Sequence, residues 1–293
     1  MILLAVSGGI DSMYMAYKAI EQSQEFAVAH CNFGLRGEES DGDEQFVRDW
    51  CGERGVRCFV KRFETASYAA EHGISIEMAA RDLRYAWFAE LCREHGFKGV
   101  AVAHNANDNA ETLILNLLRG TGSRGIRGMG DSDGKIRPLL KTTREEIRSW
   151  MISRGYSWRE DRTNADSVYK RNLIRNEVFP LFARINPSFI QTLGRDMAHF
   201  AEVDDIAEDY FREAVEKLGC DLSDPVVNIP LLKSFKHWKY ILWRILEPYN
   251  LSEETFGKLI ALLESDRTIS GKVFQSPGHL VEIHRKSLSV AKR

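Results

Sequence analysis

Residues 2–12 read Ile2-Leu3-Leu4-Ala5-Val6-Ser7-Gly8-Gly9-Ile10-Asp11-Ser12, and a helix-like pattern follows from Met13 to Ile20. The apolar run predicts a buried strand, and the glycine pair predicts a tight turn from that strand into the helix. Glycine lets the backbone approach an oxyanion closely and adopt positive φ, while Ser7, Ser12 and the first N–H groups of the helix can donate hydrogen bonds to it. The stretch therefore predicts a phosphate-binding loop.

The spacing excludes two other phosphate-binding loops. A Walker loop has four residues between its glycines and a lysine directly after the second, and no lysine follows Gly9. A dinucleotide-binding loop needs Gly-x-Gly-x-x-Gly, which is also absent. The remaining alternative is a purely structural Gly-Gly turn, but the two serines and Asp11 beside the glycines favour an anion site.

Short apolar runs alternate with helix-like patterns in the first half of the chain, which is typical of an α/β fold. The strand candidates are Ile2–Val6, Phe26–His30, Val56–Phe63, Val100–His104 and Ile136–Leu140. This alternation predicts a parallel sheet with helices on both faces and ligands at the carboxyl ends of the strands. Three segments should therefore converge on one crevice: Ser7–Ser12, His30–Arg36 and His104–Thr112.

From about Asn186 onward the pattern changes to successive helices. The helix candidates are Ile190–Leu218, Leu231–Pro248 and Glu253–Ser265, and residues 272–290 have some strand character. The sequence therefore predicts a catalytic α/β domain over residues 1–185 and a mainly helical domain over residues 186–293 with a short β-like segment near its end.

Composition indicates a soluble, cytoplasmic protein with enough apolar residues for a sizeable core. No apolar run approaches the ~20 residues that span a bilayer, and no basic leader precedes the first strand, so no membrane partner is expected. The five cysteines are scattered without a Cys-x-x-Cys pair, which disfavours a disulfide framework, a zinc or cluster site and sulfur-transfer chemistry.

Charge is distributed unevenly along the chain. The formal net charge is −2, yet residues 119–175 contain fourteen Lys and Arg against seven Asp and Glu. This basic segment, which includes Arg171 and Arg175, predicts a surface for a polyanion such as RNA. An ordinary solvated surface whose charges happen to cluster is the alternative.

Asp11, Asp108 and Glu111 are the acids at the predicted strand ends. Cleavage of ATP between its α and β phosphates needs Mg²⁺ with oxygen ligands, which these carboxylates can supply. A capping box at the start of the helix after Asn107 is the structural alternative for Asp108 and Glu111. Arg81 can grip a phosphate or a carboxylate bidentately, and a surface ion pair with Glu77 is its alternative.

Eight motifs together resemble the tRNA(Ile)-lysidine synthetase family of PP-loop ATP pyrophosphatases. They are Ser7–Ser12, His30–Ser40, Ala80-Arg81-x-x-Arg84-Tyr85-x-x-Phe88, Asp108-Asn-Ala-Glu111-Thr112, Arg119-Gly120-Thr121-Gly122, Arg137–Leu140, Trp158–Asn164 and Arg171–Pro180. The resemblance covers about residues 1–185, whereas the loop alone would indicate only the superfamily.

The resemblance implies a two-step reaction on the wobble cytidine of tRNA(Ile) with a CAU anticodon. ATP adenylates the C2 oxygen and releases pyrophosphate, and the ε-amine of L-lysine then displaces AMP. It implies that Ser7, Gly8, Gly9, Ile10 and Ser12 bind the pyrophosphate portion of ATP. It also implies a helical domain that contributes to tRNA binding.

The other site residues follow from the same resemblance. Asp11 and Asp108 would bind Mg²⁺, and Asp108 and Glu111 could instead receive the lysine ammonium group. Arg81 and Arg119 would contact phosphate or the lysine carboxylate. We expect His30 and His104, at the ends of the second and fourth strands, to line the nucleotide site; a general base is not assigned, and a homodimer stays open.

Two departures from the family pattern affect these expectations. The family often has two consecutive aspartates and a glutamine where this chain reads Asn107-Asp108-Asn109, and Asn107 cannot supply a charge. Many members also carry a further C-terminal domain that helps to grip the tRNA. A synthetase for a small-molecule acid and a non-catalytic RNA-binding protein remain the alternative functions.

Overall fold

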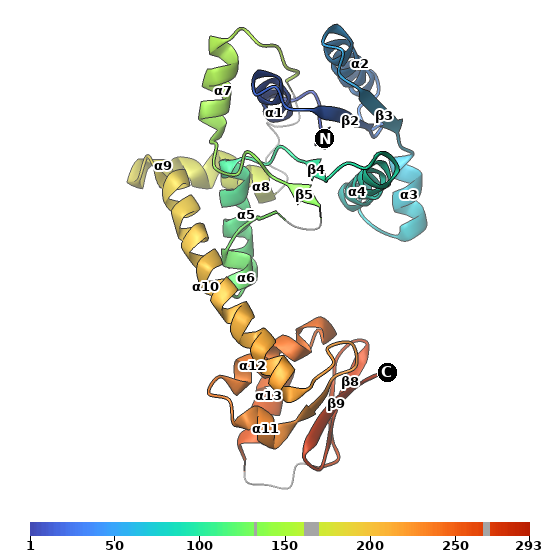
Figure 1. Cartoon of the computed structure of the whole chain (residues 1–293). Helices are drawn as coiled ribbons and strands as arrows, with labels where there is room; N and C mark the ends of the chain where they lie inside the picture. Colours follow the sequence, from blue (N-terminus) through green and yellow to red (C-terminus); the bar gives the residue numbers. More distant parts are fainter. Residues whose placement is uncertain (132–133, 161–169, 266–269) are drawn as a thin grey trace. The chain divides into compact units, whose positions relative to one another are not determined.

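The computed structural model describes residues 1–131, 134–160, 170–265 and 270–293 (Figure 1). By its internal contacts the chain divides into two compact units, Met1–Ala201 and Glu202–Arg293. The division lies within one long helix, and the expected domain limit after residue 185 stays a prediction. None of the helices in the described ranges is long and apolar enough to cross a bilayer.

The first unit contains a five-stranded parallel sheet with the order β3-β2-β1-β4-β5. Its strands are β1 (Ile2–Ala5), β2 (Phe26–Asn32), β3 (Cys58–Arg62), β4 (Val100–Ala101) and β5 (Lys135–Ile136). The parallel α/β class is thus confirmed, and each of the five expected strands has a counterpart, but β4 and β5 are only two residues long and β5 shares only Ile136 with the expected strand Ile136–Leu140. The strand order reverses between β1 and β4, so the carboxyl ends of these two strands open a crevice for ligands.

Helices cover both faces of this sheet (Figure 1). The helices α1 (Ile10–Glu21), α2 (Glu38–Glu53) and α7 (Arg144–Ser153) pack on one face, and α4 (Ile76–His95) packs on the other. The other helices of this unit are α3 (Thr65–His72), α5 (Ala106–Arg119), α6 (Ser123–Ile126), α8 (Lys170–Leu173), the π-helix η2 (Ile174–Val178) and α9 (Phe179–Ile185). The helix α10 (Phe189–Leu218) follows and continues into the second unit.

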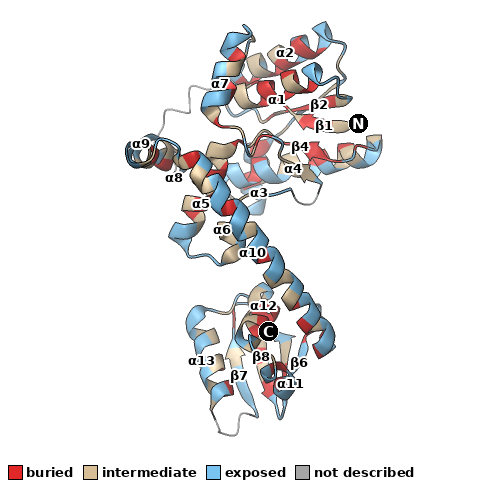
Figure 2. Ribbon diagram, turned by 60° about the vertical axis from the view of Figure 1, so that its left-hand side comes forward, coloured by how far each residue is buried: buried red, intermediate tan, exposed pale blue. Residues whose placement is uncertain are grey.

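Successive residues of the central strand point to opposite sides of the sheet and belong to two different cores. Leu4 packs with buried side chains of α1, α2 and α7, whereas Leu3 packs with Trp87 and Phe88 of α4. In Figure 2 the buried residues gather on the strands and on the helix faces that meet them. A third core joins α5 to η2, α9 and the start of α10, and this packing positions the end of the basic segment beside α5.

The second unit combines the rest of α10 with short helices and a four-stranded antiparallel sheet of order β6-β9-β8-β7. Its elements are β6 (Val226–Asn228), α11 (Ile229–Lys233), α12 (Trp238–Leu246), the 3₁₀-helix η3 (Glu247–Tyr249), α13 (Glu253–Glu264), β7 (Lys272–Gln275), β8 (His279–His284) and β9 (Ser287–Lys292). The strand character of residues 272–290 thus belongs to a full sheet, whose fourth strand β6 was not predicted.

Candidate active site

The loop between β1 and α1 has the geometry of an anion site. Gly8 has φ of +94°, a conformation that favours glycine. Gly9 is the N-cap of α1 and has no side chain that could accept a hydrogen bond. The backbone N–H groups in the first turn of α1 therefore have no side-chain cap and can donate to an anion. The Ser12 hydroxyl accepts from the Ser7 backbone N–H at 3.1 Å and donates to the Gly9 carbonyl at 2.9 Å, which fixes the loop.

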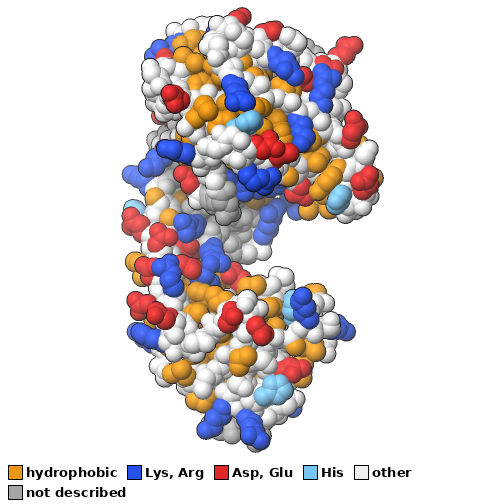
Figure 3. All heavy atoms as spheres, turned by 45° about the vertical axis from the view of Figure 1, so that its right-hand side comes forward, with side chains coloured by type: hydrophobic (Ala, Val, Ile, Leu, Met, Phe, Trp, Pro, Cys, Tyr) orange, Lys and Arg blue, Asp and Glu red, His pale blue; other side chains and the backbone are white. Residues whose placement is uncertain are grey.

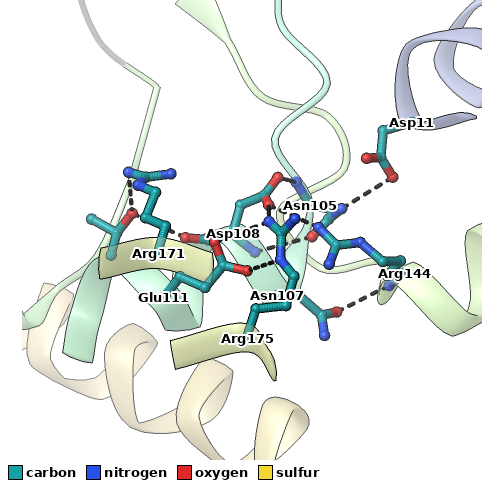
Figure 4. A network of polar contacts seen from close by, with 9 residues as sticks. Asp11, Asn105, Asn107, Asp108, Glu111, Arg144, Arg171 and Arg175 are labelled. Atoms are coloured by element: carbon teal, nitrogen blue, oxygen red, sulfur yellow. Dashed lines mark hydrogen bonds and ion pairs between the residues drawn. The ribbon is translucent and has the colours of Figure 1, made fainter. Parts of the chain in front are cut away.

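The start of α5 carries a capping box whose acid also belongs to the site. The Asp108 side chain accepts from the backbone N–H of Asn105 at 3.1 Å, and the Asn105 side chain accepts from the backbone N–H of Asp108 at 3.0 Å. The second Asp108 oxygen accepts from Arg144 at 3.2 Å (Figure 4). Asn105 also donates to Asp11 at 3.0 Å, so the capping box connects α5 to the phosphate-binding loop.

Glu111 of α5, which is buried, and Arg175 of η2, which is half-buried, form an ion pair (Figure 4). Both Glu111 oxygens are engaged, with Nε of Arg175 at 2.8 Å from Oε1 and Nη2 at 3.1 Å from Oε2. Glu111 is fully buried, and Arg175 also reaches Asp108 at 3.4 Å. Burial opposes the charge of Arg175, but hydrogen bonds and attraction from these carboxylates raise the pKa of the guanidinium group above its ordinary value.

Asp11 lies in an environment that disfavours its negative charge. Burial and the nearby negative charge of Asp108 raise the pKa of Asp11, although the hydrogen bond from Asn105 and the charges of Arg144 and Arg175 act in the opposite direction. A cation placed between Asp11 and Asp108 would relieve this repulsion.

A cavity of about 650 Å³ opens at the carboxyl ends of β1, β2 and β4. The sequence-predicted residues Ser7, Gly9, Ile10, Asp11, Ser12, His104 and Asp108 line it. His104 has a buried Nδ1 with no hydrogen-bond partner in the described part of the chain, and burial lowers its pKa. The crevice expected from strand order is therefore present, and the segments after β1 and β4 meet there.

Other predicted site residues lie elsewhere. Gly8 is outside the cavity lining and contributes through the conformation of the loop. Glu111 is also outside the lining and forms the ion pair with Arg175. His30 is buried, with Nδ1 at 2.9 Å from the Val6 carbonyl oxygen, and does not line the cavity. Burial lowers the pKa of His30.

Neither of the two arginines expected to contact a ligand reaches the cavity. Arg81 is exposed and its guanidinium group lies 5.2 Å from the centre of the Tyr85 ring, while Arg119 is exposed at the end of α5. Arg84, one helical turn after Arg81, lines the cavity instead. Arg81 and Arg84 share one face of α4, and this spacing could have indicated Arg84 as a second candidate for the ligand contact.

Sequence reasoning missed most of the cations at the site. Arg144 and Arg148 of α7 and Arg159 line the cavity, and Arg175, which we expected on an RNA-binding surface, forms the ion pair with Glu111. The motifs Trp158–Asn164 and Arg171–Pro180 contain Arg159 and Arg175, but the contacts of these arginines join segments far apart in the chain, which no local pattern indicates. Three motif residues, Asp161, Thr163 and Asn164, lie outside the described residues.

The carboxylates fit a divalent cation only in part. No group of three or more His, Cys, Asp and Glu side chains in the described ranges could hold a metal ion by itself. Both Glu111 oxygens are occupied by Arg175, whereas Asp11 and Asp108 line the cavity. Magnesium often uses one or two carboxylates together with phosphate oxygens and water, and Asp11 fits that set. Asp108 also lines the cavity, but its oxygens already accept hydrogen bonds from Asn105, Arg144 and Arg175.

Two family profiles match the chain. The PP-loop domain matches residues 1–182, and the TilS substrate binding domain matches residues 223–293. The first match includes the whole cavity lining, and the second lies within the second compact unit.

Curated relatives cover almost the whole chain. The tRNA(Ile)-lysidine synthase of Parabacteroides distasonis is 38% identical over 95% of this chain and 63% of its own length. That of Chlorobaculum tepidum is 38% identical over 90% of this chain and 83% of its own length. The chain thus spans about 63% of the length of the first of these relatives and most of the second.

A solved structure confirms the fold. The U34-tRNA thiolase NcsA from Methanococcus maripaludis, determined with its [4Fe-4S] cluster, superposes with a TM-score of 0.58 at 18% sequence identity. The match covers 69% of this chain and 72% of the thiolase. At this sequence identity the match shows only that the two proteins share a fold.

Proposed function

Because the chain belongs to the tRNA(Ile)-lysidine synthase family, we propose that it uses ATP to attach L-lysine to C2 of the wobble cytidine of tRNA(Ile) with a CAU anticodon. The observation that carries this proposal is the single cavity wall that joins the phosphate-binding loop to the Asp108–Arg144–Arg175 cluster. One end suits a triphosphate, and the other suits a zwitterionic amino acid.

ATP would bind across the carboxyl ends of β1 and β2. The loop from Ser7 to Ser12 would bind the phosphates at the start of α1, where the helix dipole favours negative charge. Cys31 and Phe33 line the cavity beyond this loop, with the Arg84 guanidinium group 5.2 Å from the centre of the Phe33 ring. This partly apolar end suits the adenine base.

L-lysine would bind at the start of α5. Its carboxylate suits the guanidinium groups of Arg144 and Arg175, and its ε-ammonium group suits Asp11 and Asp108. The ammonium group must lose a proton before the amine attacks C2, and either of these carboxylates can accept it. Glu111 would act as a positioning residue, because Arg175 occupies both of its oxygens.

In the first step, before they receive the ammonium group, Asp11 and Asp108 would hold Mg²⁺, and the ion would supply positive charge for cleavage between the α and β phosphates. In the first step the cytosine O2 would attack the α phosphorus, and pyrophosphate would leave. In the second, the amine of lysine would bond to C2 as the C2–O bond to AMP breaks. A homodimer stays a prediction, which the mass of the particle in solution would check.

The decisive experiment is incorporation of labelled lysine into unmodified tRNA(Ile) and tRNA(Met) transcripts that both carry a CAU anticodon, with and without ATP. We expect ATP-dependent labelling of tRNA(Ile) alone. Labelling of both would mean that this chain lacks the element that separates the two tRNAs. Absence of labelling together with tRNA-independent pyrophosphate release would instead favour the small-molecule synthetase.

A further inference from the structure

Arg159 packs directly on the phosphate-binding loop. Its backbone N–H donates to the Gly8 carbonyl at 2.9 Å, and its Cγ lies 3.6 Å from the point where a Cβ on Gly8 would lie. More than a hundred residues separate Arg159 from this loop in the chain, so the contact brings a cation to the phosphate site that the loop motif does not contain.

Asp43 of α2 holds Arg159 and a second arginine at this place. Its Oδ1 accepts from Nε of Arg159 at 2.9 Å, and its Oδ2 accepts from Nη2 of Arg36 at 2.8 Å. The Asp43 side chain is only 15% exposed. The terminal nitrogens of Arg159 donate no hydrogen bond to the described residues, so they can still donate to a ligand.

All three side chains face the same ligand space. Arg36, Asp43 and Arg159 line the 650 Å³ cavity together with the loop residues Ser7 and Ser12. They also line an adjoining cavity of about 450 Å³. Two guanidinium groups that converge on one carboxylate form the arrangement that a phosphate group also accepts.

We propose that Arg36 and Arg159 bind the β and γ phosphates of ATP and the pyrophosphate that leaves, and that Asp43 is the positioning residue for both. This inference rests on the proposed function and adds residues that the loop motif does not contain. When the bond between the α phosphorus and the bridging oxygen breaks, the oxygen and its electron pair leave with pyrophosphate. Preorganised guanidinium groups would stabilise that charge.

Direct binding of magnesium pyrophosphate and of AMP to the full chain, measured by calorimetry, tests the proposal. Arg159→Ala should weaken pyrophosphate binding at least about tenfold, because a charge-assisted phosphate contact is lost, while AMP binding stays within about twofold. Arg154→Ala is the matched control, since Arg154 pairs with Glu21 and does not line the cavity. Arg159→Lys should give an intermediate loss because lysine keeps the charge without the planar fork.

Asp43→Asn tests the positioning role. It should also weaken pyrophosphate binding with little change in AMP binding, and Asp43→Glu should recover part of the affinity. Wild-type pyrophosphate affinity in both Arg159→Ala and Asp43→Asn would overturn this inference while leaving the proposed function intact. Failure of the unaltered chain to bind either ATP or pyrophosphate would overturn both.

Discussion

The Asp11 carboxylate lowers the stability of the folded protein when it is ionised. Burial and Asp108 raise its pKa, so the folded state disfavours the ionised form that prevails in the unfolded chain at neutral pH. The resulting loss of stability is absent below the ordinary pKa of aspartate, about 4, grows as the pH rises from there to the raised pKa, and is constant above it. This is the pattern expected where a site is preorganised for a cation.

We therefore expect Asp11→Asn to raise the melting temperature of the ligand-free protein at pH 7 and to abolish lysine incorporation. The gain over the unaltered chain should shrink as the pH falls toward 4, because both chains are then neutral at this position. Thermal unfolding at several pH values measures the gain. A lower melting temperature at pH 7 would show that the Asp11 carboxylate stabilises the fold.

Substitutions in the pair Glu111–Arg175 should lower stability, unlike Asp11→Asn, because Arg175 compensates the buried charge of Glu111. Arg175→Met should cost about 3–5 kcal/mol in the free energy of unfolding, since it leaves a buried carboxylate without its partner. The double variant Glu111→Gln, Arg175→Met should recover much of this loss without recovering lysine incorporation. Denaturant unfolding and the incorporation assay separate the two effects, and full activity of the double variant would contradict the role of Arg175.

At the scale of elements, the two adjacent glycines in the turn from β1 into α1 have different backbone conformations. Gly8 has a positive φ, whereas Gly9 has φ of −71°. We expect Gly8→Ala to lower the free energy of unfolding by about 1–2 kcal/mol and to weaken ATP binding, because L residues disfavour this φ. Gly9→Ala is the control for stability, since its Cβ would meet only the Ser7 hydroxyl at 3.5 Å. Equal stability of the two variants would refute the argument.

The elements also show where sequence reasoning succeeds. The strands of the parallel sheet, the loop before α1 and a capping box near Asp108 follow from local patterns, so they could be predicted, although the N-cap is Asn105. Arg175 could not be placed, because its contact with Glu111 depends on η2 packing against α5 in the third core. Arg81 and Arg84 differ by one helical turn, and only the packing of α4 against the sheet determines which one reaches the cavity.

For the molecule as a whole, net charge alone gives little indication of an RNA partner. Basic and acidic side chains are interspersed on the face shown in Figure 3. Binding of tRNA should therefore depend on individual phosphate contacts more than on the total charge of −2. Arg175 pairs with Glu111 and is therefore not a candidate for a phosphate contact. Arg171 is exposed and remains the candidate to test.

Arg171 is exposed and donates to the Thr112 hydroxyl at 3.2 Å. Arg171→Ala should weaken tRNA binding and reduce the slope of log affinity against log salt concentration by about 1, if one phosphate contact is lost. Arg54→Ala provides the control, because Arg54 is exposed, pairs with Glu53 and lies outside both the basic segment and the second unit. Filter binding over a salt series would measure both slopes, and identical slopes would remove Arg171 from the RNA-binding surface.

The position of β1 in the middle of its sheet also affects how a ribosome makes the protein. Its partner β2 emerges soon after it, but β4, the neighbour on its other side, follows only at Val100. At translation rates of about 5–20 residues per second, one edge of β1 waits on the order of ten seconds without a partner. A nascent chain stalled before Val100 should therefore recruit chaperones, and nucleotide can protect the chain from proteases only after β4 has left the exit tunnel.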